Sequence, residues 1–173
     1  MVLEDEPARG DYFDRARRVA ATGLFVAGVL AVAGSLLPWV EVTPPLVVPE
    51  AEAERADALI GIEISDGRVV LVAGVVIIAA AALLVLRRRS GWAWLALAAS
   101  ILVGAIGISD YRQVSGFRPE AGVQPPFVRR AERAGEVDPA FALILVAAAG
   151  IVGLVASVGA LAATPSDRQS GRV

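Results

Sequence analysis

The fold is decided by a stretch that reads VVLVAGVVIIAAAALLVL from Val69 to Leu86, continues through RRRSG, and enters WAWLALAASILVGAIGI from Trp92 to Ile108. Two more stretches without a charged residue run from Ala21 to Val40 and from Phe141 to Ala163. As helices they would be roughly 25–35 Å long, which matches a hydrocarbon core of about 30 Å. A soluble helix of this length would carry charges on one face. The sequence therefore predicts an all-α, four-helix membrane bundle with spans 21–40, 69–86, 92–108 and 141–163.

Arginine placement predicts the orientation of these spans. With both termini inside, the inner segments hold nine arginines in 33 residues, whereas the outer loops hold seven in 58. Arginine-rich short segments favour the cytoplasmic side. We therefore expect a multi-pass plasma-membrane protein with both termini in the cytoplasm. The predicted divisions are a cytoplasmic segment 1–18, a membrane domain 19–163 with outer loops 41–68 and 109–138, and a cytoplasmic tail 164–173.

Both outer loops carry patterns of their own. Residues 39–43 and 60–65 alternate between apolar and polar, as half-buried strands do. Short helices are predicted at 49–59 and 126–135, each beginning at a proline. Asp138-Pro139 is predicted to start the fourth span, as an N-cap followed by proline at the first helical position. Together these elements predict a small extracytoplasmic cap of a hairpin or sheet with short helices.

The composition excludes several kinds of chemistry. The chain has no lysine, histidine, cysteine or asparagine, so thiolate or imidazole metal sites and catalytic triads built on His or Cys are excluded. The spans contain only four polar side chains: Thr22, Ser35, Ser100 and Ser157. Ion-coupled transport usually needs ionisable residues within the membrane. We expect no enzyme activity, no cofactor, no metal site and no nucleic-acid partner.

Small residues recur at four-residue intervals within the spans. The first span has Gly23, Ala27, Ala31 and Ser35, the third has Ala96, Ser100 and Gly104, and the fourth has Ala149, Gly153 and Ser157. Small residues at this spacing let helix backbones approach closely. They indicate either packing within the bundle or a docking face for another membrane protein or a second copy of the chain.

Carboxylates gather in the outer loops, and the acidic cap around Trp39, Glu41 and Asp66, where these loops meet the spans, is expected to be a working surface for a partner together with the small-residue helix faces. Trp39 is interpreted as an interfacial ring at the headgroup level, or alternatively as a contact for a partner. The carboxylates of the outer loops are interpreted as a solvated acidic surface. Alternatively they bind a hard cation such as calcium, although the ligand order of an EF-hand is missing.

The second outer loop concentrates positive charge at Arg129, Arg130 and Arg133. We hypothesise that these arginines face the acidic segment Glu50–Glu54 and join the two loops into one cap. The alternative is that they rest on anionic lipid headgroups.

Leu37-Pro38-Trp39 at the end of the first span, Asp66-Gly67 at the start of the second and a fourth span rich in small residues resemble uncharacterised four-span actinobacterial membrane proteins. The tryptophan-operon-associated membrane protein family shares this arrangement. The resemblance implies an integral protein of the cell envelope and brings no activity with it. The order of a large outer loop, a short inner turn and a smaller outer loop is also similar to claudins, whose Gly-Leu-Trp motif and paired cysteines this chain lacks.

The sequence thus predicts a non-catalytic accessory or scaffold subunit of a cell-envelope membrane complex. Its expected partners are membrane lipids and either another membrane protein or a second copy of the chain. The alternative is a lipid-binding or lipid-transfer helper whose bundle opens laterally to an acyl chain.

Overall fold

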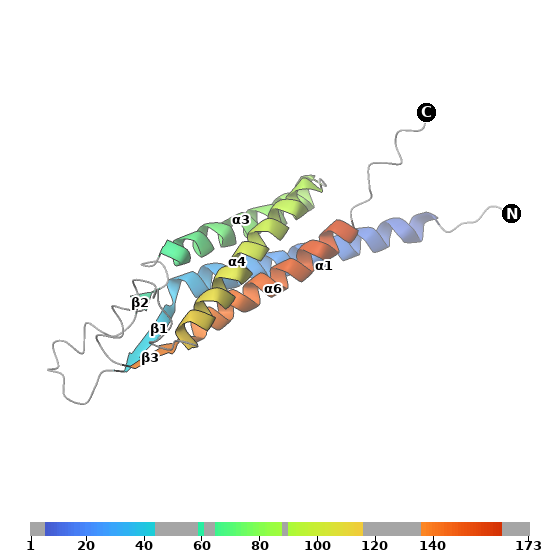
Figure 1. Ribbon diagram of the computed structural model, residues 1–173. Helices are drawn as coiled ribbons and strands as arrows, with labels where there is room; N and C mark the ends of the chain where they lie inside the picture. The colour runs from blue at the N-terminus through green and yellow to red at the C-terminus, as the bar shows by residue number, and fades with distance from the viewer. Residues whose placement is uncertain (1–5, 44–58, 61–64, 88–89, 116–135, 164–173) are drawn as a thin grey trace.

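Four long helices lie side by side, and a small sheet lies at one end of them (Figure 1). The computed structural model describes residues 6–43, 59–60, 65–87, 90–115 and 136–163. The helices are α1 (Glu6–Leu36), α3 (Ser65–Arg87), α4 (Gly91–Ser115) and α6 (Phe141–Ala162). The strands are β1 (Pro38–Thr43), β2 (Leu59–Ile60) and β3 (Glu136–Pro139).

All four helices are long and apolar enough to cross a membrane. They contain 31, 23, 25 and 22 residues in chain order, which corresponds to roughly 33–46 Å at about 1.5 Å per residue. α3 and α4 each contain a whole apolar stretch, α6 contains all of its stretch but the last residue, and α1 contains the first stretch as far as Leu36. The predicted four-helix bundle is therefore confirmed as a fold.

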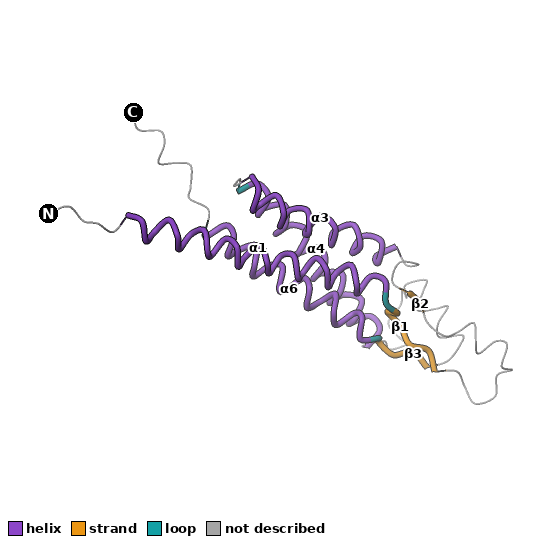
Figure 2. The backbone as a smooth tube through the Cα atoms, turned by 180° about the vertical axis from the view of Figure 1, so that it is seen from behind, coloured by secondary structure: helices purple, strands orange, loops and turns teal. Residues whose placement is uncertain are grey.

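The helices form a ring in chain order. α1 packs on α3 and α6, and α4 packs on the same two helices. Consecutive helices run in opposite directions, so the start of α1 and the end of α6 lie at the end of the bundle away from the sheet (Figures 1 and 2). This is the up-and-down order that short connections favour.

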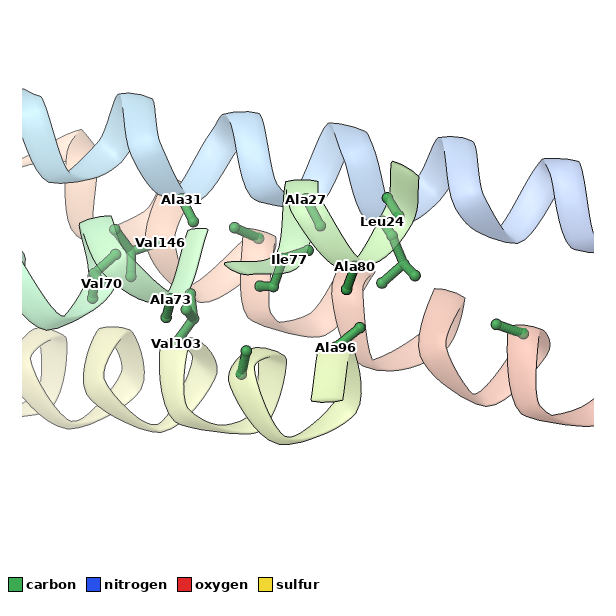
Figure 3. Packing of buried hydrophobic residues seen from close by; sticks show 14 of the residues in the cluster. Leu24, Ala27, Ala31, Val70, Ala73, Ile77, Ala80, Ala96, Val103 and Val146 are labelled. Atoms are coloured by element: carbon green, nitrogen blue, oxygen red, sulfur yellow. The ribbon is translucent and has the colours of Figure 1, made fainter. Parts of the chain in front are cut away.

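The buried side of each helix follows a spacing of three and four residues. On α4 the buried positions include Ala93, Ala96, Ser100, Val103, Gly107, Asp110 and Val114. Such spacing keeps one stripe facing the neighbouring helices of a bundle. Figure 3 shows the result at the axis, where side chains such as Ala27, Ile77, Val103 and Val146 converge from all four helices. The core is built mainly from alanine, with a few larger aliphatic residues.

Glycines set the distance between neighbouring helices. A Cβ atom added at Gly150 would overlap the backbone of Gly104 on α4, and one added at Gly107 would lie 2.7 Å from the backbone nitrogen of Ala147. On the other side of the ring, a Cβ atom at Gly28 would lie 2.8 Å from the carbonyl oxygen of Gly74. These approaches are close because no side chain separates the backbones.

The helix bounds differ from the bounds of the predicted spans. α1 begins at Glu6, well before the predicted first span, and ends at Leu36, before the predicted span end at Val40. Pro38 explains the early end, because the residue before a proline is disfavoured in the helical region. α4 continues to Ser115, seven residues beyond the apolar stretch.

α6 starts at Phe141, the first residue of the predicted fourth span, but the predicted Asp138-Pro139 cap was wrong. Asp138 and Pro139 belong to β3, and the N-cap is Ala140, which makes no side-chain capping bond. Pairing of this segment with β1 takes precedence over the local Asp-Pro signal. Strand pairing between distant segments cannot be read from such a local pattern.

The sheet has the order β2-β1-β3, and both pairings are antiparallel. β1 confirms the strand predicted at 39–43. Of the strand predicted at 60–65, β2 contains Ile60, whereas Ser65 is already the first residue of α3. The short helices predicted at 49–59 and 126–135 lie outside the described residues, apart from Leu59 in β2.

We predict that Gly150→Ala destabilises the bundle by about 1–3 kcal/mol, because its new methyl group must push α6 away from α4. Gly159→Ala on the same helix is the matched control, since a Cβ atom there meets nothing within 4 Å. Alanine is the better helix former, so the control should be neutral or more stable by up to about 1 kcal/mol. Thermal unfolding of the purified variants in detergent measures both effects. Equal stability of the two variants would contradict the packing described.

Candidate functional site

Trp39 is buried at the sheet end of the bundle. Its side chain is 1% exposed, and its indole Nε1 donates a hydrogen bond of 2.9 Å to the carbonyl oxygen of Gly34. In a continuing helix that carbonyl would accept from the backbone nitrogen of residue 38, which is a proline without an N–H. Trp39 therefore supplies the donor that Pro38 removes.

Trp39 also connects the sheet to α6. Its carbonyl oxygen accepts a hydrogen bond of 3.0 Å from the backbone nitrogen of Ala140, the N-cap of α6. The side chain thus closes the end of α1, and the backbone fixes the start of α6. The structure places Trp39 inside the fold, and neither of the predicted surface roles, a headgroup ring or a partner contact, fits a buried side chain.

The predicted small-residue surface lies mostly inside the bundle. Gly23 is partly exposed and lies beside Ala156 of α6, and Gly153 lies against Ser100 of α4. The remaining members are fully buried: Ala27, Ala31, Ser35, Ala149 and Ser157. These residues pack the four helices against one another. A partner that contacts the folded bundle would have to use other residues.

The polar side chains of the spans are satisfied within their own helices. Ser35, Ser100 and Ser157 each donate a hydrogen bond of 2.7 Å to a carbonyl oxygen three or four residues earlier. Thr22 donates in the same way to the carbonyl oxygen of Arg18 at 3.0 Å. These hydroxyl protons are therefore already used in the folded helices.

Two carboxylates lie where α3 begins and α4 ends. Asp66 is in the first turn of α3, half-buried, and accepts a hydrogen bond of 3.4 Å from the Ser65 hydroxyl. Asp110 is on the buried stripe of α4 and only 4% exposed. Sequence reasoning named Asp66 but treated Asp110 as one of several loop acids. Its place on the stripe with Val103 and Gly107 is the signal that could have identified it.

The structure describes fewer contacts for the remaining predicted site residues. The backbone of Glu41 belongs to β1 and pairs with Asp138 of β3. Arg129, Arg130 and Arg133 lie outside the described residues, so their contact with the acidic loop or with headgroups stays a prediction. Within the described part of the chain, no group of three or more His, Cys, Asp or Glu side chains is placed so that it could hold a metal ion.

The amino-terminal part of α1 was not singled out by the sequence. α1 begins farther from the sheet than the end of α6 (Figures 1 and 2). Near its start, Tyr12 is 70% exposed and contacts the ring of Phe13 edge-on. Arg15 and Arg18 are exposed on the same helix. The amino-terminal part of α1 thus offers an exposed aromatic ring and positive charge.

We predict that Trp39→Phe destabilises the fold by about 1–3 kcal/mol, because it leaves the Gly34 carbonyl oxygen buried without a donor. Trp39→Ala should cost about 3–5 kcal/mol through the cavity that it creates. Trp94→Phe is the control, since Trp94 is 61% exposed, and it should change stability by less than about 0.5 kcal/mol. Unfolding midpoints of the three variants test the ranking, and a Trp39→Phe variant as stable as Trp94→Phe would refute the anchoring role.

Comparison with protein-family models, with curated proteins and with solved structures finds no match to this chain. The resemblance to four-span actinobacterial membrane proteins therefore stays a prediction. What the chain does has to be argued from its own geometry.

Proposed function

We propose that this chain is a non-catalytic, multi-pass subunit of a membrane complex, placed in the plasma membrane with both termini in the cytoplasm. The sheet end of the bundle then faces outside, and the triple-arginine connection between α3 and α4 faces inside. This orientation follows the distribution of arginine between inner and outer segments.

The observation that carries the proposal is the filled axis of the bundle. Ala27, Ile77, Ala96 and Val146 are fully or almost fully buried there, and the serines beside them donate to their own helices. A pathway for ions needs polar groups or water along its length. A bundle whose interior is occupied by its own small side chains is better suited to hold a position in a complex than to pass a solute.

The outer faces of the helices are strongly apolar, and they are the surfaces left for lipid or for a neighbouring span. On α6 the exposed apolar side chains are Phe141, Ile144, Ile151, Val152, Leu154, Val155 and Val158. In the proposed orientation, the exposed ring of Tyr12 near the start of α1 adds a contact at the cytoplasmic end of the bundle. We infer that a cytoplasmic part of the partner binds there, because exposed tyrosine is a frequent anchor of protein interfaces.

The test is gentle extraction of the tagged protein from its own host, followed by native mass spectrometry. We expect a stoichiometric protein partner to be recovered with the native chain. In Tyr12→Ser the amount of recovered partner should fall tenfold or more, since removal of an interface anchor costs about 2 kcal/mol or more of binding free energy. Tyr111→Ser is the matched control at the other end of the bundle, where the ring is 38% exposed, and it should retain the partner.

Two results would overturn this proposal. A chain that leaves the membrane alone and carries a defined lipid would favour the lipid-binding alternative, in which α3 and α4, the smallest of the four helix interfaces, separate to admit an acyl chain. A partner that both tyrosine variants retain equally would place the contact elsewhere than on the amino-terminal part of α1.

A further inference from the structure

A hollow of about 440 Å³ lies on the exposed face of α4, in the half of the helix that ends at the sheet. Its described lining comes from one face of this helix: Ala105, Ile108, Ser109, Arg112 and Gln113. All five residues are exposed, and their spacing places them on the side of α4 opposite the buried stripe. The hollow therefore opens to the surroundings of the bundle and not to its axis.

The lining changes from apolar to polar along the helix. Ala105 and Ile108 lie nearer the middle of α4, and Ile101, which is 51% exposed, continues the same face one turn earlier. Ser109 and Arg112 follow toward the end of the helix. An apolar part next to a polar part in one hollow matches a lipid, which has an acyl chain below a polar headgroup.

The position of Arg112 along the helix supports this match. It lies four residues beyond Ile108, the last residue of the apolar stretch, which is about 6 Å along the helix axis. The headgroup layer of a bilayer is roughly 5–8 Å thick on each side of the hydrocarbon core. With the apolar stretch in the core, Arg112 lies at the level of the lipid headgroups, and Ala105 and Ile108 lie at the level of the acyl chains.

The polar part of the hollow offers hydrogen-bond donors and a positive charge. Nε2 of Gln113 donates a hydrogen bond of 3.0 Å to the Ser109 hydroxyl, which keeps its own proton for a further acceptor. Arg112 adds a permanent charge and the fork of N–H groups that fits a phosphate. Asp110, the acid of α4, lies on the buried stripe and not on this face. A phosphate would accept from both donors and balance the charge.

We propose that this hollow binds the phosphate of a membrane phospholipid. Arg112 and the Ser109 hydroxyl hold the phosphate oxygens, and an acyl chain lies over Ile108 and Ala105 toward the middle of α4. A free phosphate ion would use only the polar part of the hollow. The proposed function enters only in placing this lipid in the outer leaflet, because binding to the purified chain does not depend on orientation.

The experiment measures thermal unfolding of the purified full chain in a nonionic detergent with three probes. These are dioctanoyl phosphatidylglycerol, dioctanoylglycerol, which has the same chains without the phosphate, and inorganic phosphate at constant ionic strength. We expect the melting temperature to rise only with the phospholipid, by roughly 3–6 °C at a tenfold excess over Kd. Arg112→Gln should raise the apparent Kd about tenfold or more, because a hydrogen bond between charged groups is lost. Ser109→Ala removes one donor and no charge, and should raise it by about twofold to tenfold.

Arg68→Gln is the matched control. Arg68 is exposed in the first turn of α3, at the same end of the bundle as the hollow. The variant therefore removes the same charge outside the proposed site, and its Kd should stay within about twofold of the native value. Each variant is compared with its own melting temperature before lipid is added.

Each other outcome overturns the site. Equal stabilisation by dioctanoylglycerol would show that the chains bind without the phosphate, and stabilisation by inorganic phosphate would show an anion site that needs no lipid. An equal loss in Arg112→Gln and Arg68→Gln would show a general attraction to positive charge. A native chain that does not respond to the phospholipid, or a response that is unchanged in Arg112→Gln, refutes the site directly. None of these results bears on the protein partner, so failure of the site and failure of the proposed function are distinguishable.

Discussion

The fold depends on how closely four helices can approach each other. At Gly104 and Gly150 the backbones of α4 and α6 come together with no side chain between them, and Gly28 and Gly74 bring α1 and α3 together in the same way. In a bilayer, lipid tails are as apolar as leucine, so helices gain little from hiding apolar surface and associate through van der Waals packing. The small residues therefore explain both the ring of helices and the filled axis.

One side chain links this packing to the sheet. Pro38 ends α1 and leaves the Gly34 carbonyl oxygen without its usual donor, and Trp39 restores the bond through its indole nitrogen. The same residue accepts a hydrogen bond from Ala140 at the start of α6. Trp39, which the sequence analysis interpreted as an interfacial ring, is therefore a buried residue of β1 that is bonded to the end of α1 and to the start of α6.

The helices could be predicted because their signal is local: a long uncharged stretch has few alternatives to a buried or membrane helix. The ring order and the place of β3 could not, because each depends on segments far apart in the chain. Asp138-Pro139 is an example: the two residues have the local pattern of a helix start, but they pair with β1 as part of a strand. For the buried acid Asp110, the charge pattern alone gave no indication, and only the helical spacing with Val103 and Gly107 marks the buried face.

The most direct test of the account asks whether the bundle crosses the membrane with its sheet end outside. The chain has no native cysteine, so Ser90→Cys and Ser115→Cys, at exposed positions at opposite ends of α4, can be labelled with a membrane-impermeant maleimide on whole cells. The account predicts labelling at residue 115 in intact cells and at residue 90 only after permeabilisation. Labelling of both positions in intact cells, or of residue 90 alone, would contradict it.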